Sequence, residues 1–369
     1  MRILWSIHLY PPKHNCGAEY VAHHVNKFLM SQGHEVRVML LQNAGSPYIF
    51  EGVEVVPYPR HNVLDAYAWA DVVFTHLDYD RHTTNICGKI NRPVFHFMHN
   101  DAVDYYRYIA EARKPQYMVY NSKWVAERYS FPCASTVLYP PCPADYYRII
   151  GYPINADYIT LINTNENKGG YIFARLAEAM PERMFLAVNG SYDDGGLMPE
   201  INRRLKALPN VKFVEHSSNV REIYQQTRIL MVLSRYESWG RVATEAMSNG
   251  IPIIYTPTRG LQENIDMQGG LMMLTRGERV TDKKTGEIIS HDGDTYDVEE
   301  LKYWIEALDD EEIYSQLSDD GLIRYKELQK AEKTQLYELQ QLICQAQQDY
   351  QNIRSAVRND HRAAKFGRY

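Results

Sequence analysis

Two glutamates eight residues apart, Glu237 and Glu245, have the side chains and spacing that best support chemistry in this sequence. Gly240 lies between them and lets a ligand approach the backbone closely, and a helix is predicted to begin near Arg241. The free N–H groups and partial positive charge of a helix N-terminus suit a diphosphate. The two carboxylates can then hold groups at either end of such a ligand.

The elements that must position these glutamates follow a regular alternation. Short β-branched or aromatic runs alternate with helical patterns over residues 1–275, which is typical of β-α-β units and parallel sheets. Strands are predicted at residues 2–7, 35–41, 53–56, 72–75, 93–97, 117–120, 136–139, 158–163, 184–188, 211–214, 229–233 and 253–255. Helices are predicted at residues 18–31, 171–180, 199–205, 220–227 and 241–248.

A stiff run, Pro140-Pro141-Cys142-Pro143, interrupts this alternation and cannot lie inside a helix or a central strand. We therefore expect one α/β domain over residues 1–143 and a second over residues 144–330, each with a doubly wound parallel sheet. Ligands of such sheets bind beyond the carboxyl ends of the strands. After Gly277 no further strands are predicted, and residues 331–369 form a C-terminal helix and a basic tail.

This C-terminal helix carries an apolar stripe with alternating spacings of three and four residues. The stripe consists of Leu336, Leu339, Ile343, Ala346, Tyr350, Ile353 and Val357. Such a stripe indicates either one long helix packed on the chain's own domains or the seam of a homodimer. The basic tail is either a solvated end or a contact for an anionic partner. Its basic residues are Arg354, Arg358, Arg362, Lys365 and Arg368, and its one acidic residue is Asp360.

The composition excludes several classes of protein. Hydrophobic residues make up 45% and charged residues 23% of the 369, which indicates a folded globular chain. The longest apolar runs fall far short of the ~18 residues that a membrane span needs. The 5 cysteines form neither a disulfide framework nor a zinc site. With a net charge of −6, we expect a soluble, cytoplasmic protein without integral membrane association.

The sequence contains neither a G-x-G-x-x-G turn nor a P-loop, so its α/β domains need another ligand chemistry. The surroundings of the two glutamates resemble the E-x7-E signature of the GT-B-fold, retaining, group 1 (family 4-like) glycosyltransferases. The matching positions are Ser234, Glu237, Gly240, Glu245, Ala246, Met247, Gly250 and Pro252. Further segments are similar to motifs of that family, in the same order, and the resemblance covers residues 1–275. They are residues 11–19, 33–36, 71–76, 97–101, 121–124, 139–141, 162–170 and 258–263.

The resemblance implies two tandem Rossmann-like domains, the first binding an acceptor and the second a nucleoside diphosphate sugar. Glu245 would bind ribose hydroxyls, Glu237 the donor sugar, and Lys168 the diphosphate leaving group. His99 would lie beside the donor sugar, and Asp101 is a candidate acceptor-side base. The remaining donor-site residues implied are Gly17, Asn163, Arg235, Gly240, Arg241 and Val242. The family often has an arginine shortly before the lysine, which this chain lacks, and Arg235 or Arg241 is the candidate replacement.

The implied activity is transfer of a sugar to an acceptor hydroxyl with retention of configuration and without a metal. A sugar-nucleotide epimerase and a non-catalytic sugar-nucleotide-binding protein are the alternatives. His96 and His99 could be read as a metal pair, but a strand places them on opposite faces. The D-x-D strings Asp78-Tyr79-Asp80 and Asp292-Gly293-Asp294 are interpreted as capping or turn residues, so neither metal nor cofactor is expected.

The acceptor is the part of the reaction that the sequence specifies least. Tyr105, Tyr106 and Tyr108 follow His99, and stacking aromatic side chains suit a sugar or an unstacked base. A saccharide, a lipid-linked acceptor and a small molecule are candidates. A modified base of a nucleic acid is a further candidate, because the basic tail could contact phosphates.

Overall fold

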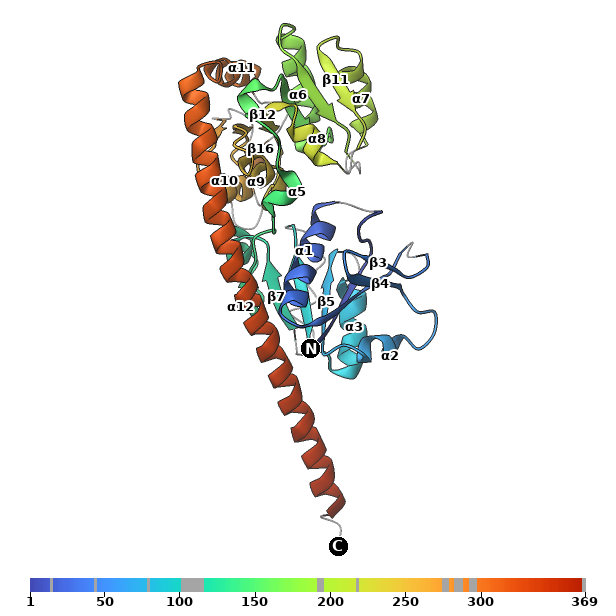
Figure 1. The fold of residues 1–369 in the computed structure, drawn as a ribbon. Helices are drawn as coiled ribbons and strands as arrows, with labels where there is room; N and C mark the ends of the chain where they lie inside the picture. The colour runs from blue at the N-terminus through green and yellow to red at the C-terminus, as the bar shows by residue number, and fades with distance from the viewer. Residues whose placement is uncertain are drawn as a thin grey trace. The chain divides into compact units, whose positions relative to one another are not determined.

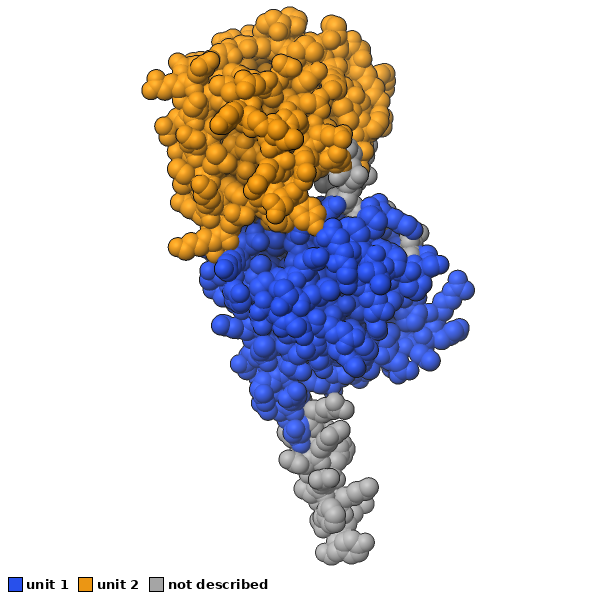
Figure 2. Space-filling view, in the orientation of Figure 1, with its two compact units in different colours: residues 1–141, 332–369 blue, residues 142–331 orange. Residues whose placement is uncertain are grey.

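The computed structural model describes residues 1–13, 16–42, 45–77, 80–100, 116–190, 196–216, 219–273, 279–281, 288–291 and 297–366. The chain forms two compact units, coloured separately in Figure 2. Unit 1 contains Met1–Pro141 together with Glu332–Tyr369, and unit 2 contains Cys142–Ala331. The last part of the chain is thus grouped with the first.

Among the described residues, unit 1 has an eight-stranded sheet with the order β3-β4-β2-β1-β5-β6-β7-β8. All pairs are parallel except β3 with β4, which form an antiparallel edge. The strands are β1 (Arg2–Ile7), β2 (Glu35–Leu40), β3 (Tyr48–Phe50), β4 (Val53–Pro57), β5 (Val72–His76), β6 (Val94–Met98), β7 (Gln116–Tyr120) and β8 (Ala134–Val137). The helices are α1 (Gly17–Ser31), α2 (Val63–Ala68), α3 (Asp80–Ile90) and α4 (Lys123–Arg128).

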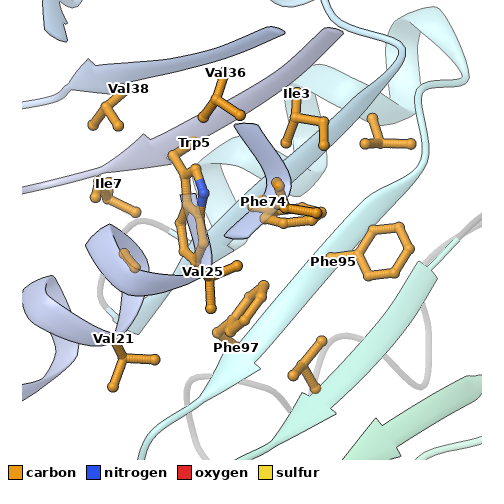
Figure 3. Close-up of a cluster of buried hydrophobic side chains, with 14 of the residues drawn as sticks. Ile3, Trp5, Ile7, Val21, Val25, Val36, Val38, Phe74, Phe95 and Phe97 are labelled. Carbon is orange, nitrogen blue, oxygen red and sulfur yellow. The ribbon is translucent and has the colours of Figure 1, made fainter. Parts of the chain in front are cut away.

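Both faces of this sheet are buried, as expected for parallel strands. Because side chains alternate along a strand, Trp5 of β1 packs on one face with α1, and Leu4 packs on the other with residues of α2 and α3. Figure 3 shows the Trp5 face, where the indole meets Phe74 and Phe97 at centroid distances of 5.1 and 4.6 Å. This core fixes the carboxyl ends of β1, β5 and β6.

The long helix α12 (Glu311–Phe366) begins in unit 2 and ends in unit 1, and Figure 1 shows it as one continuous helix. Its apolar stripe enters the core of unit 1 through Leu336, Leu339, Ile343 and Ala346. Gln335 of the same helix accepts a hydrogen bond from the backbone N–H of Tyr139 at 2.8 Å. This part of the apolar stripe therefore packs on the chain's own unit 1, which is one of the two possibilities that the sequence left open. The side chains of the basic tail lie outside the described residues.

Among the described residues, unit 2 contains a six-stranded parallel sheet with the order β11-β10-β9-β12-β13-β14. Its strands are β9 (Tyr158–Ile162), β10 (Phe185–Val188), β11 (Val211–Val214), β12 (Thr227–Val232), β13 (Ile253–Tyr255) and β14 (Gly270–Met272). Its helices are α5 (Ala144–Tyr147), α6 (Gly170–Ala179), α7 (Met198–Lys206), α8 (Val220–Tyr224), α9 (Arg241–Met247), α10 (Arg259–Ile265) and α11 (Val298–Ala307). Two short 3-10 helices are η4 (Pro153–Asn155) and η5 (Glu166–Lys168).

Helices cover both faces of this sheet as well. Residues of α6, α7 and α11 pack with Leu161, Phe185 and Met231 in the larger core, whereas Ile223 of α8 packs with Leu186 and Val188 on the opposite face. The predicted fold class, two tandem doubly wound α/β domains with a C-terminal helical extension, is confirmed.

One prediction about the elements is wrong. The sequence analysis placed no strand after Gly277, yet β15 (Arg279–Thr281) and β16 (Ile288–His291) form a separate antiparallel pair. These two strands pair with each other and not with the main sheet, so they are not part of a β-α-β unit. The alternation of strands and helices from which the other strands were predicted therefore gave no indication of them. In the part of the chain that is described, no helix is long and apolar enough to cross a membrane.

Candidate functional site

The sheet of unit 2 has a topological switch point between β9 and β12. The chain continues from β9 to β10 on one side and from β12 to β13 on the other, so the loops that leave these neighbouring strands diverge. A crevice forms at such a point, and ligands of open α/β sheets bind there. The loops concerned are residues 163–169 after β9 and residues 233–240 after β12.

The loop after β9 is held in a tight and specific shape. The side-chain Oδ1 of Asn163 accepts from the N–H of Asn165 at 3.0 Å, and Asn163 itself has a positive φ of 76°. Gly169 has a φ of +88°, and a Cβ there would lie 2.3 Å from the Cβ of Leu233. The loop therefore packs directly against the end of β12, where only glycine fits.

Two ion pairs join these loops. Lys168 donates from Nζ to Oε1 of Glu237 at 2.5 Å, and Ser234 Oγ donates to the same oxygen at 2.9 Å. Arg235 pairs with Glu166 at 2.8 Å. The side chains of Lys168 and Glu237 are 26% and 13% exposed, so both are largely desolvated yet still reachable by a ligand. The predicted diphosphate lysine and the predicted donor-sugar glutamate thus lie together.

The end of the second loop is fixed by a buried polar network. Gly240, with a φ of +82°, precedes α9. Asn264 of α10 donates to the carbonyl oxygens of Trp239 and Gly240, both at 3.0 Å, and accepts from Thr244 at 3.0 Å. These bonds set the direction in which α9 starts and hence the position of its side chains.

Glu245, one turn into α9, is the centre of a second cluster. Its Oε2 accepts from the hydroxyl of Tyr224 at 2.6 Å, and its Oε1 lies 3.4 Å from the guanidinium of Arg241. Arg241 also donates to the hydroxyl of Tyr147 at 2.5 Å. Burial raises the pKa of Tyr224 well above its ordinary value, and the Glu245 carboxylate raises it further, so this hydroxyl remains a donor. Burial opposes the charge of Arg241, but neighbouring Tyr147 and Glu245 outweigh it and raise its pKa.

The structure separates the two candidates for the missing arginine. Arg235 lies at the contact between the loops, where its backbone N–H also donates to the carbonyl of Asn167 at 2.9 Å. Arg241 is turned to Tyr147 and Glu245. Val242 occupies the first turn of α9. Arg235 is therefore the arginine that shares the loop contact with Lys168.

Sequence reasoning missed three members of these clusters, namely Glu166, Tyr147 and Tyr224. Glu166 stands two residues before Lys168 and could have been suggested by that proximity. The two tyrosines are far from Glu245 in sequence and approach it only through the packing of α5, α8 and α9. No local spacing indicates such contacts.

The sheet of unit 1 has its own switch point, between β1 and β5. His8 follows β1, His76 ends β5, and His99 follows β6. His76 Nδ1 lies 3.0 Å from His99 Nε2, and the rings of His8 and His76 are 5.4 Å apart. His8 Nε2 in turn lies 3.5 Å from Glu19 Oε1 of α1, the helix that Gly17 opens. The sequence analysis named His99 and Gly17, and His76 and Glu19 lie in two of its family-like segments, residues 71–76 and 11–19. It missed His8.

The other candidates of unit 1 fall elsewhere. Asp101 lies outside the described residues, as do Tyr105, Tyr106 and Tyr108. His96 is buried between the carboxylate of Asp80 and the side-chain oxygen of Gln116, away from His99. Of the D-x-D residues, only Asp80 is described. Within the described ranges, no three His, Cys, Asp or Glu side chains are grouped so as to hold a metal ion.

Comparisons with known proteins agree with this geometry. Residues 172–273 match the family model described as "Glycosyl transferases group 1", a range that includes Glu237 and Glu245. No curated protein sequence matches the chain.

Solved structures share the fold across nearly the whole chain. The structure of HepE from Anabaena in complex with UDP-glucose has a TM-score of 0.73 at 14% identity, covering 92% of this chain and 100% of that one. Sucrose-phosphate synthase from Thermosynechococcus elongatus has a TM-score of 0.71 at 15% identity, covering 94% and 100%. An alpha-glucosyltransferase in complex with UDP and a 13-mer DNA containing an HMU base has a TM-score of 0.60 at 14% identity, covering 93% and 99%.

The E-x7-E segment at a switch point, the matching family model and the two-unit fold lead to one conclusion. Residues 172–273 match the group 1 glycosyltransferase family, and the two units of the chain have the fold of the GT-B glycosyltransferases.

Proposed function

We propose that this glycosyltransferase moves a sugar from a nucleoside diphosphate donor, bound by unit 2, to an acceptor hydroxyl with retention of configuration. The observation that carries the proposal is the pairing of Lys168 and Glu237 at the switch point of unit 2. An ammonium group at this place suits a diphosphate, and the Glu245 carboxylate on α9 suits the vicinal hydroxyls of a ribose.

Each of these residues has a chemical task in the proposed reaction. Lys168 neutralises the diphosphate as the bond between the anomeric carbon and the phosphate oxygen breaks, which stabilises the transition state. Glu237 holds the ammonium group and hydroxyls of the donor sugar. The acceptor oxygen bonds to the anomeric carbon on the face that the diphosphate leaves, and its proton passes to the departing phosphate oxygen. Retention follows because attack and departure share one face.

No metal takes part in this proposal, because Lys168 and Arg235 supply positive charge at the loop contact. The test is incubation with UDP- and GDP-sugars, with and without acceptors, while released nucleoside diphosphate is measured. One donor should release diphosphate, at a rate that EDTA leaves nearly unchanged. The anomeric configuration of the product, read by NMR, tests retention. A strict need for added manganese would refute the metal-independent site, and conversion of the sugar without release would indicate an epimerase.

The acceptor has one specific alternative to a saccharide, a lipid-linked molecule or a small molecule. One neighbour in the fold is an alpha-glucosyltransferase bound to DNA, and this chain ends in a basic segment from Arg354 to Arg368. A modified base is therefore a second candidate acceptor. Binding to DNA at about 50 mM salt should then weaken steeply as salt rises, and truncation after Ser355 should flatten that slope. Absence of binding at low salt removes this candidate.

A further inference from the structure

One buried nitrogen in the histidine cluster of unit 1 has no hydrogen-bond partner within the described residues. His76 is fully buried, and its Nδ1 lies 3.0 Å from Nε2 of His99. Its own Nε2 is buried and unpartnered. The groups facing His76 are His8 beyond β1, the edge of Trp5 at a centroid distance of 6.0 Å, and His99, with Glu19 of α1 next to His8.

This environment keeps His76 neutral. Burial lowers the pKa of His76 well below its ordinary value, and the neighbouring His99 and His8 lower it further. A neutral imidazole carries one proton, on either Nδ1 or Nε2. A proton on Nε2 would be a buried N–H without an acceptor, which is rare in folded proteins. A proton on Nδ1 is instead donated to His99 and leaves only a lone pair unused.

We propose that His76 is a positioning residue that holds His99 as one neutral tautomer, accepting at Nε2 and carrying its proton on Nδ1. His99 then meets the sugar substrate as a hydrogen-bond donor and not as an acid or a base. This kinetic consequence rests on the proposed function, whereas the tautomer does not. Asn121 supports the same residue, because its Nδ2 donates to the backbone oxygen of His99 at 2.8 Å.

The same geometry opposes a second proton on His99. A second proton on its Nε2 would set two N–H groups against each other over 3.0 Å. A donor at position 76 therefore selects the tautomer with the proton on Nδ1. An acceptor at position 76 would select the opposite tautomer, with the proton on Nε2. Whether residue 76 is a hydrogen-bond donor or an acceptor thus decides which ring nitrogen of His99, Nδ1 or Nε2, carries the proton.

The tautomer can be read without any activity measurement. In wild-type protein labelled with ¹⁵N-histidine, long-range ¹H–¹⁵N correlation spectra distinguish protonated from bare ring nitrogens, and the His99→Gln variant assigns the signals. We expect His99 to carry its proton on Nδ1 and to have a bare Nε2 at neutral pH. A protonated Nε2 on His99 would overturn the proposal, whatever the enzyme's substrates prove to be.

Two substitutions of equal size then test the consequence. His76→Asn keeps an N–H near the position of Nδ1, whereas His76→Asp offers only acceptor oxygens. As pH rises from about 5 to about 8, the range in which histidines change charge, kcat of His76→Asp should fall to about one thirtieth of that of His76→Asn, while the donor KM changes little. The Asn variant should keep the pH profile of the wild type. Parallel pH profiles for the two variants would contradict the proposal, and the wild-type spectrum decides it should either variant fail to fold.

Discussion

Replacement of Lys168 by alanine removes the ammonium group at the contact between the two donor-site loops. In the native structure its Nζ lies 2.5 Å from Glu237 Oε1, and after the change Ser234 is the one described donor left to that oxygen, at 2.9 Å. Two effects follow, one on catalysis and one on stability, and their sizes can be worked out separately.

The catalytic effect should be the larger one. Loss of one preorganised group facing the developing charge typically costs about 10²–10³ in kcat. Because the Lys168 side chain is 26% exposed, water can replace part of its effect, which favours the lower end of that range. We expect kcat to fall about 100-fold, or ~2.7 kcal/mol, with the donor KM changed less than about threefold.

The stability effect should be smaller. Removing one partner of a fully buried ion pair costs about 3–5 kcal/mol. The partial exposure of Lys168 and Glu237 lets water reach the remaining carboxylate, so about 1–2 kcal/mol is expected here. The variant should therefore be folded when its activity is assayed, which circular dichroism and a urea titration would verify.

The assay is release of nucleoside diphosphate from the accepted donor under saturating conditions. Lys302→Ala is a matched control, since Lys302 pairs with Glu299 at 3.1 Å within α11, a helix that supplies no residue to either loop. That control should keep wild-type kcat. Turnover of Lys168→Ala within threefold of the control would refute the role given to the ammonium group.

Three further predictions concern other parts of the molecule. Tyr224→Phe removes the 2.6 Å hydrogen bond to Glu245. The donor KM should rise about tenfold, equivalent to ~1.4 kcal/mol of binding free energy, with little change in kcat. An unaltered KM would contradict the proposed binding of the ribose by Glu245. Gly169→Ala should lower the free energy of unfolding by at least about 2 kcal/mol, because the new Cβ would lie 2.3 Å from the Cβ of Leu233. Gly196 also has a positive φ, but a Cβ there would meet no atom within 4 Å. Gly196→Ala should therefore lower the free energy of unfolding by only about 1 kcal/mol. Burial lowers the pKa of His76 and of His23 in the folded protein, so below about pH 6.5 the unfolded chain binds more protons than the folded one. The urea midpoint of unfolding should therefore drop as the pH falls through that value, and less steeply in His76→Asn. A urea midpoint that does not change with pH would show that these histidines are not buried in the neutral form.

Much of the fold could be predicted because its elements are strongly periodic. The strands at residues 2–7, 211–214 and 253–255 have the predicted bounds, since each is a short apolar run between clear breaks. β3 was missed because three residues at an edge give no repeating pattern. The strand predicted at residues 136–139 lies at Ala134–Val137. The prediction began two residues late because Ala134 and Ser135 are small residues that are not typical of strands.

The site could be predicted only as far as its residues share a local segment. Glu237, Gly240 and Glu245 stand in one loop and helix, whereas Lys168 was added only through the resemblance of its loop to the donor-phosphate loop of the family. The partners that orient them could not be predicted. Tyr224 reaches Glu245, and His76 reaches His99, through the packing of separate elements, which no spacing in the sequence records.

The most direct test of the account is binding of a nucleoside diphosphate to wild-type protein and to Glu245→Ala, with Lys302→Ala as control. At about 100 times Kd, a ligand that binds only the folded state stabilises it by ~2.7 kcal/mol, which a thermal melt detects readily. The account predicts that UDP, GDP or ADP raises the melting temperature of the wild type and of the control, and not that of Glu245→Ala. An equal rise in Glu245→Ala, or no rise with any nucleoside diphosphate, would contradict it.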